Sequence, residues 1–218
     1  MVQHRPYFIL ASRSPRRREL LQEAGYRFEV KPPPVEDRGA ARRLSPGSAR
    51  AKPGFAEATP GAYVESMAYL KAMATIEAHG LAEGLVLGAD TAVELGGRLI
   101  GKPADEADAR RILSHLSGSE HCVLTGLALV DLPSRRRRLA HDVTRIRMRT
   151  MSPQEIDAYV AGGEALGKAG AYALQETADR YVEAIDGSRT NVVGLPMELL
   201  ERLIKAMGYE PKDFRGWL

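Results

Sequence analysis

Near the N-terminus the chain reads Tyr7-Phe8-Ile9-Leu10-Ala11-Ser12-Arg13-Ser14-Pro15-Arg16-Arg17-Arg18-Glu19-Leu20-Leu21. The apolar run suits a buried strand, Ser12 or Ser14 suits a helix N-cap, and Pro15 suits the first helical position, where its missing N–H costs nothing. A helix start offers free backbone donors, and arginine grips phosphate with paired hydrogen bonds, so this junction suits an anion. An ordinary capped helix with a solvated basic face fits the segment equally well.

The composition is that of an ordinary soluble chain. Its 218 residues, 44% hydrophobic and 27% charged, suffice for one domain or for two small lobes around a cleft. The net charge of +3, from 31 basic and 28 acidic residues, favours anionic ligands without demanding a polymer. A single cysteine, Cys122, excludes an intrachain disulfide and a cysteine-based zinc site. The lone cysteine suits a reducing compartment, the N-terminal apolar run is too short for a signal-peptide core, and no apolar run approaches the roughly 20 residues of a membrane span, so we expect a cytoplasmic protein.

The first half of the chain predicts alternating strands and helices. A second strand is expected at 28–30, followed at about 38–61 by a basic loop or insertion rich in Gly, Pro and Ala. Thr59-Pro60 then starts a helix that ends at Gly80. Its apolar stripe is expected at Tyr63, Met67, Leu70 and Ala74.

The segment 85–89 has the continuous apolar character of a buried strand, which we expect to stop at Asp90. Beyond it, Gly96-Gly97 predicts a hairpin turn. The second half predicts helices at 106–116 and 153–160, the latter with a capping box at Ser152. Strands are predicted at 121–132 and 139–149, a hairpin-like region at 181–193 and a C-terminal helix ending near Gly208.

Asp90 is the strongest candidate for chemistry. In open α/β sheets, ligands bind beyond the carboxyl ends of strands, and the hairpin that follows leaves Asp90 no helix to cap. An aspartate is ordinarily a weak base at neutral pH, so a divalent metal, Mg²⁺ or Mn²⁺, is expected to help it activate water.

Three single lysines, Lys71, Lys102 and Lys168, stand in glycine- or alanine-rich settings. Each suits the protein surface, but together they could complement the arginines around a triphosphate. The chain has no Walker-type phosphate loop, dinucleotide-binding fingerprint, zincin helix or nucleophile-elbow serine. The familiar nucleotide-binding folds and serine hydrolases are therefore not indicated.

Six motifs, in order and spacing, resemble the Maf family of nucleoside triphosphate pyrophosphatases. They are Leu10-Ala11-Ser12-x-Ser14-Pro15-Arg16-Arg17-x-Glu19-Leu20-Leu21, Gly88-Ala89-Asp90-Thr91, Gly101-Lys102-Pro103, Leu116-Ser117-Gly118, Lys168-Ala169-Gly170-Ala171-Tyr172 and Val193-Gly194-Leu195-Pro196. The resemblance covers nearly the whole chain. It implies a single Maf-like domain over 1–218, with an elongated mixed-sheet α/β fold similar to inosine triphosphate pyrophosphatases and an active-site cleft between two lobes.

The resemblance also implies an activity, the metal-dependent splitting of a nucleoside triphosphate into the monophosphate and pyrophosphate, and a homodimer. By match of motif, Asp90 would activate water, and the phosphates would be held by Ser12, Arg16, Arg17, Lys71 and Lys102. Asp37 stands where the family usually has a glutamate that helps with metal or water, so metal contacts are expected from Asp37 and Asp90.

Base preference is implied in the same way. Family members acting on dTTP and UTP resemble this chain at Arg16, at Thr91 and in the run from Lys168 to Gln175. Alternative functions are a 7-methyl-GTP-type pyrophosphatase and a non-hydrolytic nucleotide-binding regulator of septum formation. Nucleic-acid binding through the basic segments 38–52 and 135–138 is a third, which the lack of an aromatic platform disfavours.

Overall fold

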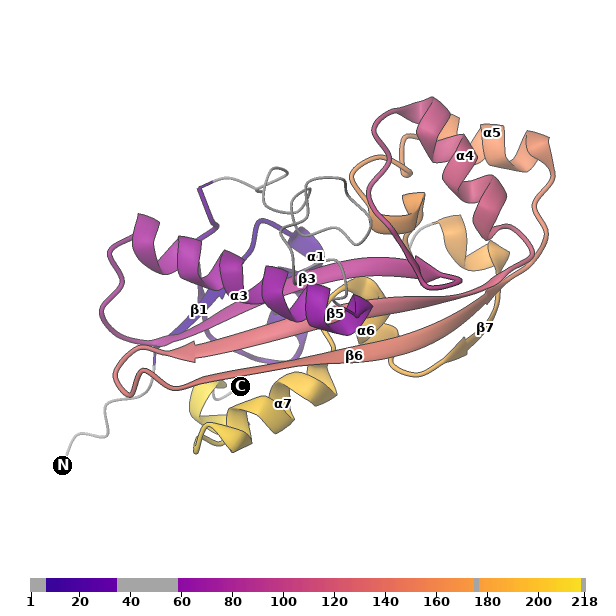
Figure 1. Cartoon of the computed structure of the whole chain (residues 1–218). Helices are drawn as coiled ribbons and strands as arrows, with labels where there is room; N and C mark the ends of the chain where they lie inside the picture. Colours follow the sequence, from indigo (N-terminus) through magenta and orange to yellow (C-terminus); the bar gives the residue numbers. More distant parts are fainter. Residues whose placement is uncertain (1–6, 35–58, 175–176, 217–218) are drawn as a thin grey trace.

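The computed structural model describes residues 7–34, 59–174 and 177–216, which form a mixed α/β fold (Figure 1). The strands are β1 (Phe8–Ala11), β2 (Glu29–Val30), β3 (Leu85–Leu95), β4 (Arg98–Ile100), β5 (Glu120–Asp131), β6 (Arg137–Met148) and β7 (Val182–Asp186). The α-helices are α1 (Pro15–Glu23), α3 (Pro60–Ala78), α4 (Glu106–Leu116), α5 (Pro153–Ala161), α6 (Arg189–Val193) and α7 (Met197–Ala206). Short 3-10 helices are η1 (Ala169–Ala171), η2 (Thr177–Tyr181) and η3 (Pro211–Phe214).

The described strands form one mixed sheet in the order β2-β1-β3-β5-β6-β7, with β4 paired to the far end of β3. β1 runs parallel to β2 and β3, whereas β3, β5, β6 and β7 are successively antiparallel. Figure 1 shows α3 lying along one face of this sheet and α7 along the other. The α/β fold class is thereby confirmed. None of the helices in the described ranges has the length and apolar character needed to span a bilayer.

Alternate residues of β3 face opposite sides of the sheet, as the pleat requires. Leu87 and Ala89 join the apolar cluster that includes α1 and α7, whereas Val86 packs with Ala72 of α3. Asp90 therefore belongs to the face that α3 covers, and Thr91 belongs to the face shared by α1 and α7. A second large cluster gathers α4, α5 and the turn at 169–172 around the far ends of β3, β5 and β6.

Helix α3 packs unusually close to the sheet because two glycines lie beneath it. A Cβ on Gly88 would overlap the carbonyl of Ala68, and one on Gly126 would overlap the backbone of Val64. The buried residues of α3 are accordingly small or flexible: Gly61, Val64, Met67, Ala68, Ala72 and Thr75. The expected stripe is wrong in part, since Leu70 is 41% exposed. The closeness of the backbones selects small residues for the buried face, which apolar periodicity alone does not reveal.

Two further expectations are corrected. The strand predicted to stop at Asp90 continues to Leu95, because β5 pairs with β3 from Leu85 to Glu94 and carries the ladder through the aspartate. The region 181–193 is not a hairpin. β7 pairs with β6 instead, and Ser188 caps a helix, α6, by accepting from the backbone N–H of Asn191.

The other local predictions are confirmed. Ser14 and Thr59 cap α1 and α3, each with proline in the first turn. Asp105 caps α4, and Ser152 forms the expected capping box with Glu155. The predicted hairpin at Gly96-Gly97 joins β3 to β4.

The close packing of α3 yields a stability prediction. Gly126→Ala should lower the free energy of unfolding by about 2–3 kcal/mol, because the added methyl group forces the helix away from β5. Gly101→Ala is the control, since a Cβ there meets no atom within 4 Å. Chemical denaturation measures both. Equal stability of the two variants would contradict the close approach.

Candidate active site

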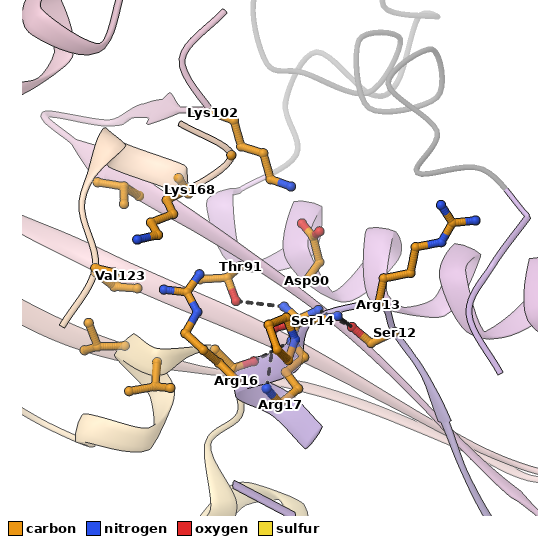
Figure 2. Close-up of a pocket in the computed structure, with 18 of the residues that line it drawn as sticks. Ser12, Arg13, Ser14, Arg16, Arg17, Asp90, Thr91, Lys102, Val123 and Lys168 are labelled. Atoms are coloured by element: carbon orange, nitrogen blue, oxygen red, sulfur yellow. Dashed lines mark hydrogen bonds between the residues drawn. The ribbon is translucent and has the colours of Figure 1, made fainter. Parts of the chain in front are cut away.

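The pocket that gathers the predicted site residues opens where β1 ends. β1 pairs with β3 as far as Ala11, which lies opposite Gly88, and β4 joins β3 from Val93 onward. The edge of β3 between these two strands borders a pocket of about 280 Å³ (Figure 2). The predicted residues that line it are Ser12, Arg16, Arg17, Lys71, Asp90, Thr91, Lys102 and Lys168. The structure thus brings together residues that are up to 156 positions apart in sequence.

The turn between β1 and α1 presents a helix start to this pocket. Ser14 is the N-cap and accepts from the backbone N–H of Arg17, whereas the Ser12 hydroxyl accepts from the backbone N–H of Ser14 at 3.2 Å. Pro15 occupies the first turn, as its fixed φ favours. The positive end of the α1 dipole lies at the pocket, which suits an anionic ligand.

Arg17 is buried, with 8% of its surface exposed. Its Nε donates to the carbonyl of Gly194 at 2.8 Å, and Nη1 donates to the Ser12 hydroxyl at 3.2 Å and to the carbonyl of Ala89 at 3.0 Å. Nη2 donates to the Thr91 hydroxyl at 3.0 Å. Arg17 therefore ties the β1–α1 turn, β3 and the turn after α6 together. Its expected contact with phosphate stays a prediction.

The hydrogen bonds continue from Arg17 through the sheet. Thr91 Oγ1 lies 2.9 Å from Thr125 Oγ1, and the Thr125 hydroxyl donates to the carbonyl of Asn191 at 2.9 Å. The Asn191 amide in turn donates to the carbonyl of Val123 and to Thr144 Oγ1, each at 2.9 Å. This chain of donors fixes α6 against β5. Apart from Thr91, its members lie in none of the six motifs, because they come from separate elements.

Asp90 forms an ion pair with Lys71 across the space between β3 and α3. Lys71 Nζ donates to Asp90 Oδ1 at 2.6 Å, and the two side chains are 20% and 16% exposed. Because the pair is partly buried, water and salt screen the attraction between the two charges only weakly, so each side chain holds the other in place. The carboxylate consequently stands at the pocket with a cation beside it.

Cationic side chains outnumber acidic ones in the described lining of the pocket. Arg13, Arg16, Arg17, Lys71, Lys102 and Lys168 contribute positive charge, and the acidic side chain among the described lining residues is Asp90. Figure 2 shows Arg16 reaching toward Lys168 and Val123, with Lys102 above Asp90. Arg13 points to the other side and donates to the carbonyls of Pro33 and Pro34. Such a concentration of positive charge attracts polyphosphate.

An aromatic side chain, Tyr172, is among the residues that line the pocket. It is only 5% exposed, and its hydroxyl lies 2.7 Å from Nε2 of His121. Burial lowers the pKa of His121 to about 4, so its ring is neutral at physiological pH. Burial likewise raises the pKa of Tyr172, which stays a phenol. A lone histidine in an apolar strand gives no sequence signal for this pairing.

Part of the expected site lies outside the described residues. Asp37, Gln175 and the loop from 38 to 58 fall in that category. Within the described ranges, no group of three or more His, Cys, Asp or Glu side chains could hold a metal ion. Among the described lining residues of the pocket, the one with a carboxylate is Asp90.

The buried guanidinium of Arg17 yields a prediction. Arg17→Lys should cost about 3 kcal/mol of folding stability, because an ammonium cannot reproduce the four directed hydrogen bonds. Arg18→Lys, at an exposed position of the same helix, is the matched control and should change stability by less than about 0.5 kcal/mol. Thermal unfolding distinguishes them. An Arg17→Lys protein as stable as the control would show that these bonds contribute little.

Comparison with known proteins identifies the family of the chain. The family model described as Maf-like protein matches residues 7–207. The chain is similar to a protein of Pelotomaculum thermopropionicum named dTTP/UTP pyrophosphatase, with 41% identity over 92% of this chain and 96% of that protein. Proteins with the same name from Gloeobacter violaceus and Moorella thermoacetica are 46% and 42% identical, covering 90% and 93% of this chain and 93% and 95% of theirs.

The match extends from β1 to the end of α7 and so includes every described segment that lines the pocket. Both the family model and the similar proteins cover nine-tenths or more of the chain. This chain belongs to the Maf family.

Proposed function

We propose that this chain hydrolyses nucleoside triphosphates, with dTTP and UTP as preferred substrates, to the monophosphate and pyrophosphate. The names of its relatives, at 41–46% identity over most of both chains, support the reaction and the substrates. The observation that carries the proposal is the carboxylate of Asp90, which lies among cations in the described part of a pocket at a helix start. That combination suits the cleavage of a phosphoanhydride.

Substrate phosphates would bind where positive charge and backbone donors meet. Ser12 and Arg16 lie at the start of α1, and Lys102 and Lys168 reach the same pocket from other segments. The three cations would neutralise the triphosphate, the Ser12 hydroxyl would donate a hydrogen bond to it, and together they would hold it in line for attack. Arg17 is our candidate for a further phosphate contact, and it would also fix the Ser12 turn through its hydrogen bond.

Asp90 would accept the proton of the attacking water. The water oxygen bonds to phosphorus, the anhydride oxygen leaves with the other product, and the released proton passes to the carboxylate. Lys71, 2.6 Å from Asp90, would keep the carboxylate aimed at the pocket. The reaction needs no covalent intermediate on the protein.

A divalent cation fits the described residues if substrate oxygens complete its shell. Mg²⁺ is commonly bound by one or two carboxylates together with phosphates and waters, and Asp90 supplies one such carboxylate. Asp37, outside the described residues, is our candidate for a second. A bound cation would neutralise phosphate charge and acidify water.

The pyrimidine preference is attributed to Arg16, Thr91 and Gln175. Arg16 extends along the side of the pocket where Lys168 lies, which suits contact with a base or ribose (Figure 2). The Thr91 hydroxyl is bonded to Arg17 and Thr125, so we infer that Thr91 shapes the pocket through these contacts. The similar proteins reported above share the dTTP/UTP name, which favours this preference over 7-methyl-GTP.

A nucleotide panel tests the proposal. With Mg²⁺ or Mn²⁺, purified protein should release pyrophosphate from UTP and dTTP faster than from CTP, GTP or 7-methyl-GTP, and a chelator should stop it. Asp90→Asn should lower kcat by about 10²–10⁴-fold, because the proton acceptor is lost. Asp186→Asn, at the exposed end of β7, is the control and should keep full activity.

Two outcomes would contradict the proposal. Tight nucleotide binding by the wild-type protein without turnover would favour a non-hydrolytic regulator. Retained activity in Asp90→Asn would remove Asp90 from the proton-accepting role and leave the reaction to another group.

A further inference from the structure

The turn that carries Lys168 into the pocket has an unfavourable backbone. Gly170 has φ 71° and Ala171 has φ 60°, so two successive residues adopt the left-handed conformation. Residues with a Cβ rarely adopt it, and they keep it when the surroundings hold them there. The turn at 168–172 therefore depends on contacts outside itself for its shape.

Backbone contacts supply part of that support. The N–H of Gly170 donates to the carbonyl of Gly101, outside the turn, at 3.2 Å, and within the turn the N–H of Ala171 donates to the carbonyl of Lys168 at 3.1 Å. Since Gly101 precedes Lys102, the first bond ties the segments of the two pocket lysines together. Ala171 is fully buried in the cluster that also contains α4 and α5.

A buried polar pair gives further support. His121, on β5, is 2% exposed, and its Nε2 shares a hydrogen bond with the Tyr172 hydroxyl at 2.7 Å. The rings meet edge to face with centroids 5.5 Å apart. Nδ1 of His121 is buried and has no hydrogen-bond partner in the described part of the chain. A buried nitrogen without a hydrogen-bond partner lowers the free energy of unfolding. An apolar side chain would therefore fill this space better than the His121 ring.

We propose that His121 is a positioning residue for the substrate pocket: through its hydrogen bond to Tyr172 it sets the 168–172 turn and holds Lys168 at the substrate. The inference rests on the proposed function and deepens it. His121 does not line the pocket, whereas Tyr172 and Lys168 do. Its effect on substrate therefore passes through Tyr172.

The two sides of the pocket respond differently to the loss of this bond. Asp90 and Lys71 are carried by β3 and α3, and their ion pair does not involve the 168–172 turn. A displaced Lys168 weakens the hold on substrate and leaves the proton acceptor in place. KM should rise while kcat changes little, whereas a partly unfolded preparation would lose kcat at an unchanged KM.

Kinetics of four variants and one control test the pair. His121→Phe and Tyr172→Phe should each raise KM for UTP about tenfold, and the double variant should raise it no further, because either change breaks the same bond. His121→Gln should restore a KM near that of the wild type, since its amide can bond the Tyr172 hydroxyl. Tyr181→Phe, which removes another buried hydroxyl from the same apolar cluster, should leave KM unchanged.

A second readout does not need activity. Trypsin cleavage after Lys168 is followed by mass spectrometry below the unfolding temperature. It should be about tenfold faster in His121→Phe and Tyr172→Phe than in the wild type and the Tyr181→Phe control. A wild-type protein that hydrolyses no nucleotide would overturn the proposed function, and cleavage after Lys168 would still decide the role of His121.

The proposal is overturned if His121→Phe and Tyr172→Phe keep the wild-type KM, or if they are cleaved after Lys168 no faster than the Tyr181→Phe control. It is also overturned if the single effects multiply in the double variant, since two independent contacts would then be responsible. Failure of His121→Gln to restore KM, with its stability intact, would likewise exclude the hydrogen bond as the cause.

Discussion

The guanidinium of Arg17 connects three parts of the chain that are far apart in the sequence. They are the Ser12 turn, β3 at Ala89 and Thr91, and the turn at Gly194. A buried cation is tolerated when directed acceptors surround it, and here backbone carbonyls and hydroxyls fill that role. Because β1 ends beside this point and β3 continues past it, the same hydrogen bonds that stabilise the junction also define one wall of the pocket.

Around that junction the fold separates two tasks. The ion pair of Asp90 and Lys71 spans β3 and α3, whose close approach depends on the missing side chains of Gly88 and Gly126. The other cations arrive on separate segments, with the Lys102 and Lys168 regions joined by a backbone hydrogen bond. A rigid acceptor on one side and a supported set of cations on the other suit a reaction in which a highly charged substrate must be held while water attacks it.

Local sequence signals predict local structure well here. Caps at Ser14, Thr59 and Ser152 place their helices because each cap is a contact within three residues. The motifs also predict which side chains meet in the pocket. The features that the sequence pattern does not predict depend on residues that are distant in the sequence. Asp90 lies within a strand because β5 continues to pair beside it, and the buried face of α3 follows from glycines on other strands. The pairing of His121 with Tyr172 spans 51 residues and has no local signature.

The central claim is that the edge of β3 beyond the end of β1 is where a nucleoside triphosphate is cleaved. A crystal structure of the protein with Mg²⁺ and a non-hydrolysable UTP analogue tests it most directly. We predict that the phosphates lie against the Ser12–Arg16 turn and Lys102, within reach of Asp90, with the uracil toward the side of the pocket where Tyr172 lies. An analogue bound elsewhere, or bound here with its phosphates pointing away from Asp90, would contradict the account.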